Sequence, residues 1–426
     1  MTLRETGWRS LFTAPIVEAA SDVEALIARQ ARENAGTVNL VASESYCPRA
    51  TLEAEASVLV NKNASGYPPR VSFAGGEVID AIEALAIARA RRLFGAEHAN
   101  VQALSSTIAN VAVLRALLSP GDRILAFDRN AGGHSSHGSG RHLSGQDYAV
   151  EWFGVDAAGR VDYDAARQKA MAFRPRMVIA GSSAYPWNID FAALRRVADA
   201  CGALLFADIA HVSGLIAAGL LPNPVPACDV ATTSTHKTFC GPRTGGLILC
   251  RAKHGPAIDA ALAPGLQAAP GAHIIAARAV LFDLASRPAF RLLMERVLAG
   301  AARMAESLLA AGVPLYAGGT DTHMVVVDLR RTAWAEKDLN QALERHGIVA
   351  NTTTLPRRPG DASALGLRIG STPMAIRGMD LDGFGDVARA LAARLAAGPG
   401  AQDDEMLAGR MRAMAAAHPI PFGGLS

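Results

Sequence analysis

The chain has 426 residues, half of them hydrophobic, and a formal net charge of +3 with 19% charged residues. This length exceeds one domain of ~150 residues and supplies a large apolar core. The near-neutral charge lacks the basic stripe that nucleic-acid binding requires, and no apolar run is long enough to span a membrane.

The cysteines favour a reducing environment. The five cysteines are odd in number and contain no CxxC pair, so neither a disulfide framework nor a zinc site is indicated and no metal is expected. The first ten residues lack the apolar region of a signal peptide. We therefore expect a cytoplasmic protein.

The N-terminal part of the chain predicts an arm and two helices. Residues 21–36 predict a helix, with Ser21 as its N-cap and Gly36 as its stop. Residues 61–76 contain too many Gly, Pro and Asn for a regular element. Residues 77–95 again have helical spacing. We expect residues 1–40 to form an N-terminal arm with its helix.

Strands and helices then alternate. Short apolar runs predict strands at 123–128, 176–181, 203–208, 230–234 and 245–250. Helical patterns, including 107–118 and 191–202, separate most of them. Such alternation indicates an α/β fold, a mostly parallel sheet with helices on both faces. The last two strands are close enough in sequence to pair antiparallel.

The C-terminal part predicts a second, smaller α/β unit. A long helical stretch around 281–300 is interrupted at Pro288. The pattern then restarts, with strands at 323–329 and 365–371 and helices at 336–347 and 381–398. We expect a large domain over 41–295 and a small C-terminal domain over 296–426.

Chemically reactive side chains follow four predicted strands at their carboxyl ends, where open α/β sheets bind ligands. In chain order they are His134 and His137, Ser183, Asp208 and His211, and Thr235, His236 and Lys237. Ser105, Ser106 and Thr107 precede a helix, where backbone N–H groups and hydroxyls can hold an anion.

Together these residue types suit pyridoxal 5'-phosphate. A lysine forms an imine with its aldehyde, and an aspartate keeps its ring nitrogen protonated. A helix N-terminus holds the phosphate, and a histidine stacks on the ring. Each residue alone has an ordinary explanation, such as a helix cap or a solvated loop. Their joint occurrence at successive strand ends favours the cofactor.

Several longer stretches carry a family likeness. They are LVASES (40–45), GGEVIDAIEALAIARARRLFGAEHANVQ (75–102), GGHSSHGS (132–139), DIAHVSGLIAAG (208–219), PNPVP (222–226), TSTHKT (233–238), and GLRIGSTP with IRGM (366–379). With these stretches the chain resembles serine hydroxymethyltransferase, a fold-type I, aspartate aminotransferase-like enzyme dependent on pyridoxal 5'-phosphate. The resemblance covers about residues 35–420.

The resemblance implies a role for each site residue. Lys237 would be the Schiff-base lysine, Asp208 would meet the ring nitrogen, and His134 would stack on the ring. The other implied cofactor contacts are His211 and Ser183 at the phenolic oxygen, Ser105, Ser106, Thr107 and His236 at the phosphate, and Thr235 beside them. Arg368 and Ser43 would hold the substrate carboxylate. A homodimer, or a tetramer, is implied because the family's counterpart of loop 61–76 reaches the neighbouring site.

The sequence departs from the family where folate is handled. Asn63 stands where the family has a tyrosine, and Ser65 stands where it has a glutamate. Ser72 and Phe73 stand where the family has two tyrosines. We expect Asn63, Ser65 and Phe73 to face the substrate. Other family residues are replaced as well: a leucine by Arg129, an asparagine by Thr353, and two glycines by Leu266 and Ala268. Thr244 is an insertion relative to the family. The glutamate moves protons on the substrate hydroxyl and on folate, and serine cannot act as that base.

These losses favour a folate-independent enzyme that changes bonds at Cα and Cβ of an amino acid or amino-acid conjugate. One reaction is β-elimination of an S-substituted cysteine, as in lincosamide-type antibiotic biosynthesis. Another is retro-aldol cleavage, with His134, His137 or His211 taking the hydroxyl proton. Serine/glycine hydroxymethyl transfer with tetrahydrofolate, a decarboxylating oxidase of the same family, and a cofactor-binding protein without activity stay open as alternatives.

Overall fold

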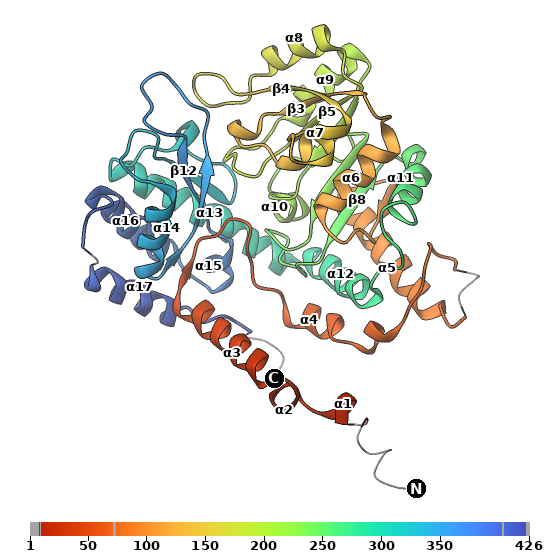
Figure 1. Cartoon of the computed structure of the whole chain (residues 1–426), viewed down its shortest axis with the longest axis horizontal. Helices are drawn as coiled ribbons and strands as arrows, with labels where there is room; N and C mark the ends of the chain where they lie inside the picture. The colour runs from red at the N-terminus through yellow and green to blue at the C-terminus, as the bar shows by residue number, and fades with distance from the viewer. Residues whose placement is uncertain (1–7, 9, 71–73, 403, 423–426) are drawn as a thin grey trace.

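The computed structural model describes residues 8, 10–70, 74–402 and 404–422. Two lobes, each built on its own sheet, lie side by side, and a helical arm extends from them toward the N-terminus (Figure 1). Both lobes are α/β, so the predicted fold class is confirmed.

The larger lobe contains a sheet of seven strands among the described residues, in the order β2-β8-β7-β6-β5-β3-β4. The strands are β2 (His98–Asn100), β3 (Arg123–Phe127), β4 (Ala149–Phe153), β5 (Met177–Gly181), β6 (Leu204–Asp208), β7 (Val230–Ser234) and β8 (Gly246–Cys250). Strands β4, β3, β5, β6 and β7 run parallel, and β8 pairs antiparallel with β7, as the short connection predicts.

Successive residues of the central strands enter two different cores. In β3, Ile124 and Ala126 pack on one face, while Leu125 and Phe127 pack on the other. Strands buried on both faces are continuous apolar runs, which is why the sequence revealed them. The helices of this lobe are α4 (Arg49–Glu55), α5 (Glu77–Phe94), α6 (Ser106–Leu117), α7 (Leu143–Asp147), α8 (Tyr163–Phe173), α9 (Phe191–Cys201), α10 (Ser213–Ala217), α11 (Gly255–Leu262) and α12 (Ala272–Ala285).

The smaller lobe is built on an antiparallel sheet in the order β11-β12-β9. Its strands are β9 (Met324–Asp328), β11 (Asn351–Thr354) and β12 (Leu365–Gly370), and its helices are α13 (Pro288–Ala310), α14 (Glu336–Arg345), α15 (Thr372–Ile376), α16 (Leu381–Ala397) and α17 (Glu405–Ala417). Helix α13 begins at Pro288, where a missing N–H removes no helical hydrogen bond. It continues through residues 295 and 296, and the domain bounds 1–40, 41–295 and 296–426 stay a prediction.

The N-terminal arm consists of α1 (Ser10–Thr13), α2 (Ile16–Ala19) and α3 (Ser21–Gly36). The N-cap of α3 is Ala20 and not Ser21, because Ser21 is already the first helical residue. Strand β1 (Val38–Asn39) then pairs in parallel with β10 (Ile348–Val349), so the arm is attached to the smaller lobe. No helix among the described residues is long and apolar enough to cross a membrane.

Candidate active site

Lys237 lies in a tight loop that follows β7. The Thr235 hydroxyl donates to the Pro242 carbonyl at 2.7 Å, and the Gly241 N–H donates to the Thr235 carbonyl at 2.6 Å. The loop closes on itself through these bonds, so the Thr235 hydroxyl holds its shape. The start of the loop is set by β7, in which Thr232 pairs with Asp208, the terminal residue of β6.

The Lys237 amine is half-buried and, within the described part of the chain, makes no hydrogen bond or ion pair. Burial lowers its pKa to about 8, assisted by the charges of Arg368 and Arg243 and opposed by Asp208. A lysine with this pKa is partly neutral near pH 7, and the neutral amine is the nucleophile that attacks an aldehyde.

Asp208, the last residue of β6, is buried and fully oriented by donors. Its Oδ2 accepts from Asn110 Nδ2 at 2.8 Å and from His137 Nε2 at 2.9 Å, and its Oδ1 accepts from the Ala210 N–H at 3.0 Å. Burial alone would raise the pKa of this carboxyl. The hydrogen bond and charge of His137, with the charges of His134 and Lys237, instead hold the pKa below its ordinary value. Asp208 is therefore a fixed anion.

His134 is a neutral ring beside this anion. Its Nδ1 accepts from the Ser136 N–H at 3.2 Å and lies 2.7 Å from Ser136 Oγ, so Nε2 carries the proton. Burial, followed by the neighbouring His137, lowers the pKa of His134 to about 4. An uncharged imidazole with its edge held by Ser136 has a free flat face.

His211 stacks on His323, with ring centroids 5.5 Å apart at 21°. His211 Nδ1 lies 3.4 Å from His323 Nε2, which lies 3.0 Å from the Ala42 carbonyl. Burial lowers the pKa of both, that of His323 to about 3. The pair joins the larger lobe to the smaller lobe and to the segment that carries Ser43.

Arg368 extends from β12 of the smaller lobe to the larger lobe. Its Nη1 donates to the Ser183 carbonyl at 2.5 Å and to Ser183 Oγ at 3.3 Å. Its Nε is buried and has no hydrogen-bond partner among the described residues, although a buried guanidinium nitrogen normally has one. One edge of the guanidinium is thus available to a carboxylate. Ser43, which directly follows Ala42 in the chain, is half-buried.

The N-terminus of α6 forms an anion cup. Ser105 is the N-cap, and its Oγ accepts from the Ile108 N–H at 3.2 Å. Ser106 and Thr107 occupy the first helical positions, where backbone N–H groups have no helical partner. His236, beside Lys237, has a pKa lowered to about 4 by burial and by Lys237, and its Nδ1 is buried without a partner.

Comparison with known proteins identifies the family. The family model described as serine hydroxymethyltransferase matches residues 16–391. The chain is 43% identical over 421 residues to serine hydroxymethyltransferase 1 of Mycobacterium tuberculosis (strain CDC 1551 / Oshkosh), covering 97% of this chain and 96% of the relative. It is 43% identical over 396 residues to serine hydroxymethyltransferase of Mycobacterium avium (strain 104), covering 91% and 93%. The chain belongs to the serine hydroxymethyltransferase family.

Serine hydroxymethyltransferase family members are enzymes that use pyridoxal 5'-phosphate, and this chain is such an enzyme. The residues present fit the cofactor. Among the described residues they are a lysine amine without a hydrogen-bond partner, a buried carboxylate whose Oδ1 accepts one hydrogen bond, and a helix N-terminus with hydroxyls. Among the described residues, ligand atoms of His134, His137 and Asp208 lie within 4.8 Å of one another, a spacing that could also hold a metal ion. His137 and Asp208 already bond to each other directly.

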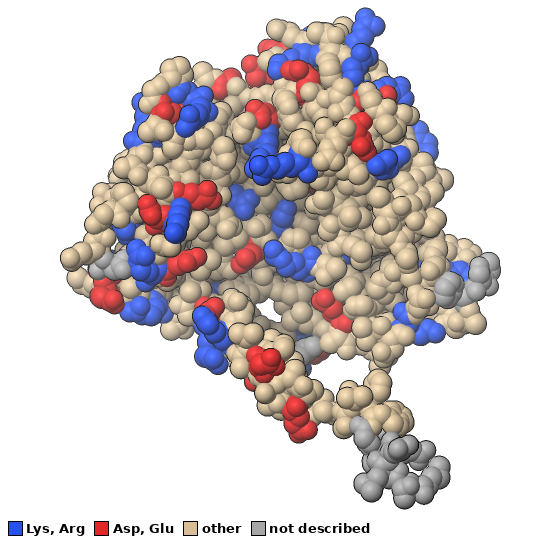
Figure 2. All heavy atoms as spheres, in the orientation of Figure 1, with Lys and Arg blue, Asp and Glu red and all other residues tan. Residues whose placement is uncertain are grey.

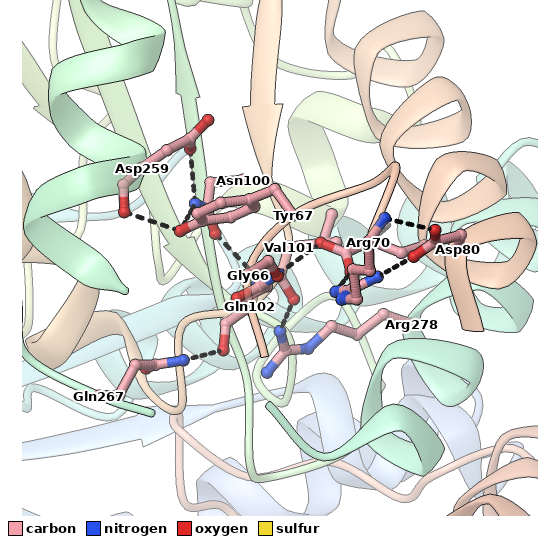
Figure 3. A network of polar contacts seen from close by, with 11 residues as sticks. Gly66, Tyr67, Arg70, Asp80, Asn100, Val101, Gln102, Asp259, Gln267 and Arg278 are labelled. Carbon is pink, nitrogen blue, oxygen red and sulfur yellow. Dashed lines mark hydrogen bonds and ion pairs between the residues drawn. The ribbon is translucent and has the colours of Figure 1, made fainter. Parts of the chain in front are cut away.

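Among the described residues, Asn63 and Ser65 make no hydrogen bond or ion pair with Lys237, Asp208 or Arg368. Asn63 and Ser65 are exposed on the loop before α5, and Phe73 lies outside the described residues. The loop is fixed to its own lobe by a polar network in which Tyr67 Oη donates to the Asp259 carbonyl and Arg70 bonds to Asp80 (Figure 3). Contact of Asn63 and Ser65 with the substrate stays a prediction.

The structure adds site residues that sequence reasoning missed or left without a role. Asn110 donates to both Ser136 Oγ and Asp208 Oδ2 at 2.8 Å, and accepts from Thr232 Oγ1 at 2.6 Å. Asn110 is an amide inside the apolar pattern of α6, and that exception was its signal. The sequence places His323 at the start of an apolar strand, and nothing in its neighbourhood distinguishes it.

A cavity of about 620 Å³ opens beside His134 and Ser183. Its walls come from both lobes, at the turn after β3 and at β11 and the start of α14. The lining residues are Arg129, Gly133, His134, Ser135, Ser183, Ala184, Trp334, Ala335, Glu336, Thr352, Thr353, Thr354, Ser363, Ala364 and Leu365. A hollow with basic side chains inside it is visible where the lobes meet (Figure 2).

Proposed function

We propose that the enzyme acts without folate, breaking bonds at Cα and Cβ of an amino acid or amino-acid conjugate. The observation that carries this proposal is Ser65, a hydroxyl at the position where the family resemblance places a catalytic glutamate. General acid–base groups typically contribute ~100- to 10,000-fold, and serine cannot ionise near neutral pH. The reactions that remain are β-elimination of an S-substituted cysteine and retro-aldol cleavage of a β-hydroxy amino acid.

The residues divide the work as follows. Arg368, with Ser43, binds the α-carboxylate through the free edge of its guanidinium. Lys237 removes and returns the proton on Cα, for which a pKa of about 8 is suitable. Asp208, kept anionic by His137 and Asn110, accepts a hydrogen bond from a protonated ring nitrogen. Bound there, pyridoxal 5'-phosphate supplies the electron sink that stabilises negative charge at Cα.

Histidines are the candidate proton carriers at Cβ. Burial lowers the pKa of both His134 and His211, so both rings are neutral. His211 is the better candidate acceptor, because Nδ1 of His134 is engaged by Ser136 and its Nε2 already carries a proton. A retro-aldol reaction needs such a base at the β-hydroxyl. Loss of a thiolate needs none, because the leaving group is already a stable anion.

We also propose a cytoplasmic homodimer. The arm exposes large apolar side chains, including Leu11 and Phe12 at 80% and Leu26 at 65%. Exposed apolar side chains gathered on one projecting element suit a partner chain. A second chain would also bring Asn63 and Ser65 to a site, as the resemblance implies.

Folate-dependent serine/glycine hydroxymethyl transfer is the second candidate. It is favoured by 43% identity to proteins that carry the name serine hydroxymethyltransferase. The two functions differ in one assay, the tetrahydrofolate-dependent cleavage of serine.

The test compares wild-type enzyme with Ser65→Glu. We expect negligible folate-dependent serine cleavage in the wild type and a gain of at least about 10-fold in Ser65→Glu, because the carboxylate restores a base. We expect the wild type to release thiol or aldehyde from S-substituted cysteines or β-hydroxy amino acids without folate, with products identified by mass spectrometry. Robust folate-dependent turnover by the wild type contradicts the proposal.

A further inference from the structure

Resting on the proposed function, we propose that the substrate side chain ends in an anionic group that binds Arg129 in the cavity beside His134. The cavity of about 620 Å³ is of the size that encloses small organic ligands. It begins at His134 and Ser183, and Ser183 is the residue that Arg368 binds. A substrate whose carboxylate is on Arg368 can therefore extend its side chain into this space.

Arg129 is held at the wall of the cavity by a rigid turn. It is the first residue of η2 (Arg129–Ala131), which Asp128 caps by accepting from the Asn130 N–H at 2.9 Å. The turn cannot shift easily, because a Cβ at Gly132 would lie 2.8 Å from the Tyr185 nitrogen and one at Gly133 would lie 2.3 Å from the Phe127 carbonyl oxygen. The same turn therefore fixes both His134 and Arg129.

The guanidinium of Arg129 is exposed and, over residues 8–422 as far as they are described, makes no hydrogen bond or ion pair. Arg330, by contrast, is paired with Asp328. An unpaired guanidinium at a cavity wall offers two parallel donors to a carboxylate or phosphate. Arg129 is therefore the cationic end of the cavity.

The part of the cavity lining that comes from α14 and β11 has a different character. Glu336, at the start of α14, accepts from Thr352 Oγ1 at 2.6 Å. Thr353 and Thr354 of β11 also line the cavity, as does Trp334, whose Nε1 donates to the Leu395 carbonyl. Repulsion from Glu336 directs an anion away from this wall and toward Arg129.

An apolar side chain would fit this cavity poorly. It would remove water from Arg129, Glu336 and the threonine hydroxyls without giving them new partners, which is unfavourable. A side chain with a terminal carboxylate replaces the water on Arg129 by a charge-assisted hydrogen bond. The chemistry of the walls therefore selects for the charge of the distal group.

The test measures binding to the cofactor-loaded enzyme by the change in cofactor absorbance. The probes share one skeleton: S-benzyl-L-cysteine, S-(4-carboxybenzyl)-L-cysteine and S-(4-aminomethylbenzyl)-L-cysteine. We expect the wild type to bind the carboxylate about 10-fold more tightly than the neutral probe, the effect of one partly exposed charged hydrogen bond. Arg129→Leu should lower this preference to about 1, and Arg129→Glu should reverse it in favour of the amine.

Arg141→Leu is the matched control, because Arg141 is exposed on the same stretch of chain but does not line the cavity. It should keep the wild-type preference. Equal binding of all three probes by the wild type, or a full preference in Arg129→Leu, overturns the inference and leaves the proposed function standing. No absorbance change with any probe, or with β-hydroxy amino acids, would instead overturn the proposed function. A preference present in the wild type and lost only in the Arg129 variants supports the inference.

Discussion

At the scale of single residues, the site depends on two opposite charges that determine each other's protonation. Asp208 raises the pKa of Lys237 while burial lowers it, and the balance is a pKa of about 8. Lys237 in turn helps to keep Asp208 anionic, after the larger contribution of His137. On an exposed surface the Lys237 amine would be almost fully protonated near pH 7, whereas Asp208 would be anionic in either setting.

This balance predicts the pH dependence of cofactor uptake. The neutral form of Lys237 is the nucleophile, and the neutral fraction rises as pH passes upward through the pKa. We expect covalent uptake of pyridoxal 5'-phosphate by the apoprotein to accelerate from pH 6 to pH 9, with its midpoint near pH 8. Stopped-flow absorbance measures the rate, and borohydride reduction with mass spectrometry locates the attachment.

Lys237→Ala should lose borohydride-trapped cofactor and essentially all activity. Lys253→Ala, which changes an exposed lysine 3.9 Å from Asp229, should keep both. A midpoint near 10.5, the ordinary lysine value, would contradict the electrostatic account. Trapping of the cofactor on another lysine would contradict the assignment of Lys237.

At the scale of elements, Arg278 of α12 couples the anion cup to the lysine loop. The buried guanidinium donates to the Val101 carbonyl, to the Ala103 carbonyl at 2.8 Å and to the Thr244 carbonyl at 3.1 Å. The first two precede the cup at α6, and the third belongs to the inserted residue in the loop after Lys237. Arg278 lies beside the polar network that fixes the neighbouring loop (Figure 3).

We therefore predict that Arg278→Lys weakens binding of the phosphate selectively. A lysine has a single terminal nitrogen and cannot take the places of both Nη1 and Nη2, so the segment before the cup loses its position. The dissociation constant of pyridoxal 5'-phosphate should rise about 10-fold, as expected for one lost charged hydrogen bond. That of pyridoxal, which has no phosphate, should change by less than about 2-fold, and absorbance titration measures both.

Arg89→Lys is the control for this prediction. Arg89 Nη1 donates at 2.7 Å to the carbonyl of Ala279, which lies on α12 as Arg278 does, and not to the segment before the cup. It should leave both dissociation constants unchanged. Equal weakening for pyridoxal and its phosphate in Arg278→Lys would mean that Arg278 stabilises the lobe as a whole and does not position the cup.

At the scale of the whole molecule, the site lies between two lobes and the arm extends beyond both (Figure 1). Arg368, His323 and the β11 hydroxyls come from the smaller lobe, whereas Lys237, Asp208 and His134 come from the larger one. The lobes must stay joined for the site to exist. The arm has few such contacts, and its apolar residues are exposed.

This arrangement predicts that Leu26→Glu converts a dimer to a monomer. Leu26 is 65% exposed on α3, so the change should not unfold a single chain, but a carboxylate at an apolar interface is strongly unfavourable. Light scattering coupled to size exclusion measures the mass. Activity should fall at least about 10-fold if Asn63 and Ser65 act across the interface.

Leu309→Glu, an exposed leucine at 46% on α13, should remain dimeric. A monomeric wild type, or a Leu26→Glu variant that stays dimeric and active, would contradict the proposed role of the arm.

The sequence by itself determined the elements with strong local patterns. Strands such as β5 and β6 are continuous apolar runs because both of their faces are buried, and they were found almost to the residue. The reactive residues were found because each follows such a strand within a few positions. The sequence does not predict β2, β4 or β11. Strand β2 has only three residues, β4 lies at the edge of its sheet, and β11 is the polar run Asn351–Thr354, so none has a comparable apolar signal.

Only the tertiary structure decided which side chains act on one another. Asn110 and Asp208 are 98 positions apart, and His211 and His323 are 112 apart, so their contacts depend on the order and register of the sheets. The lowered pKa of Lys237 likewise results from burial, and the cavity at Arg129 exists because residues of both lobes line it. Local composition specifies a residue and its element, but pKa and cavity depend on neighbours that only the folded chain supplies.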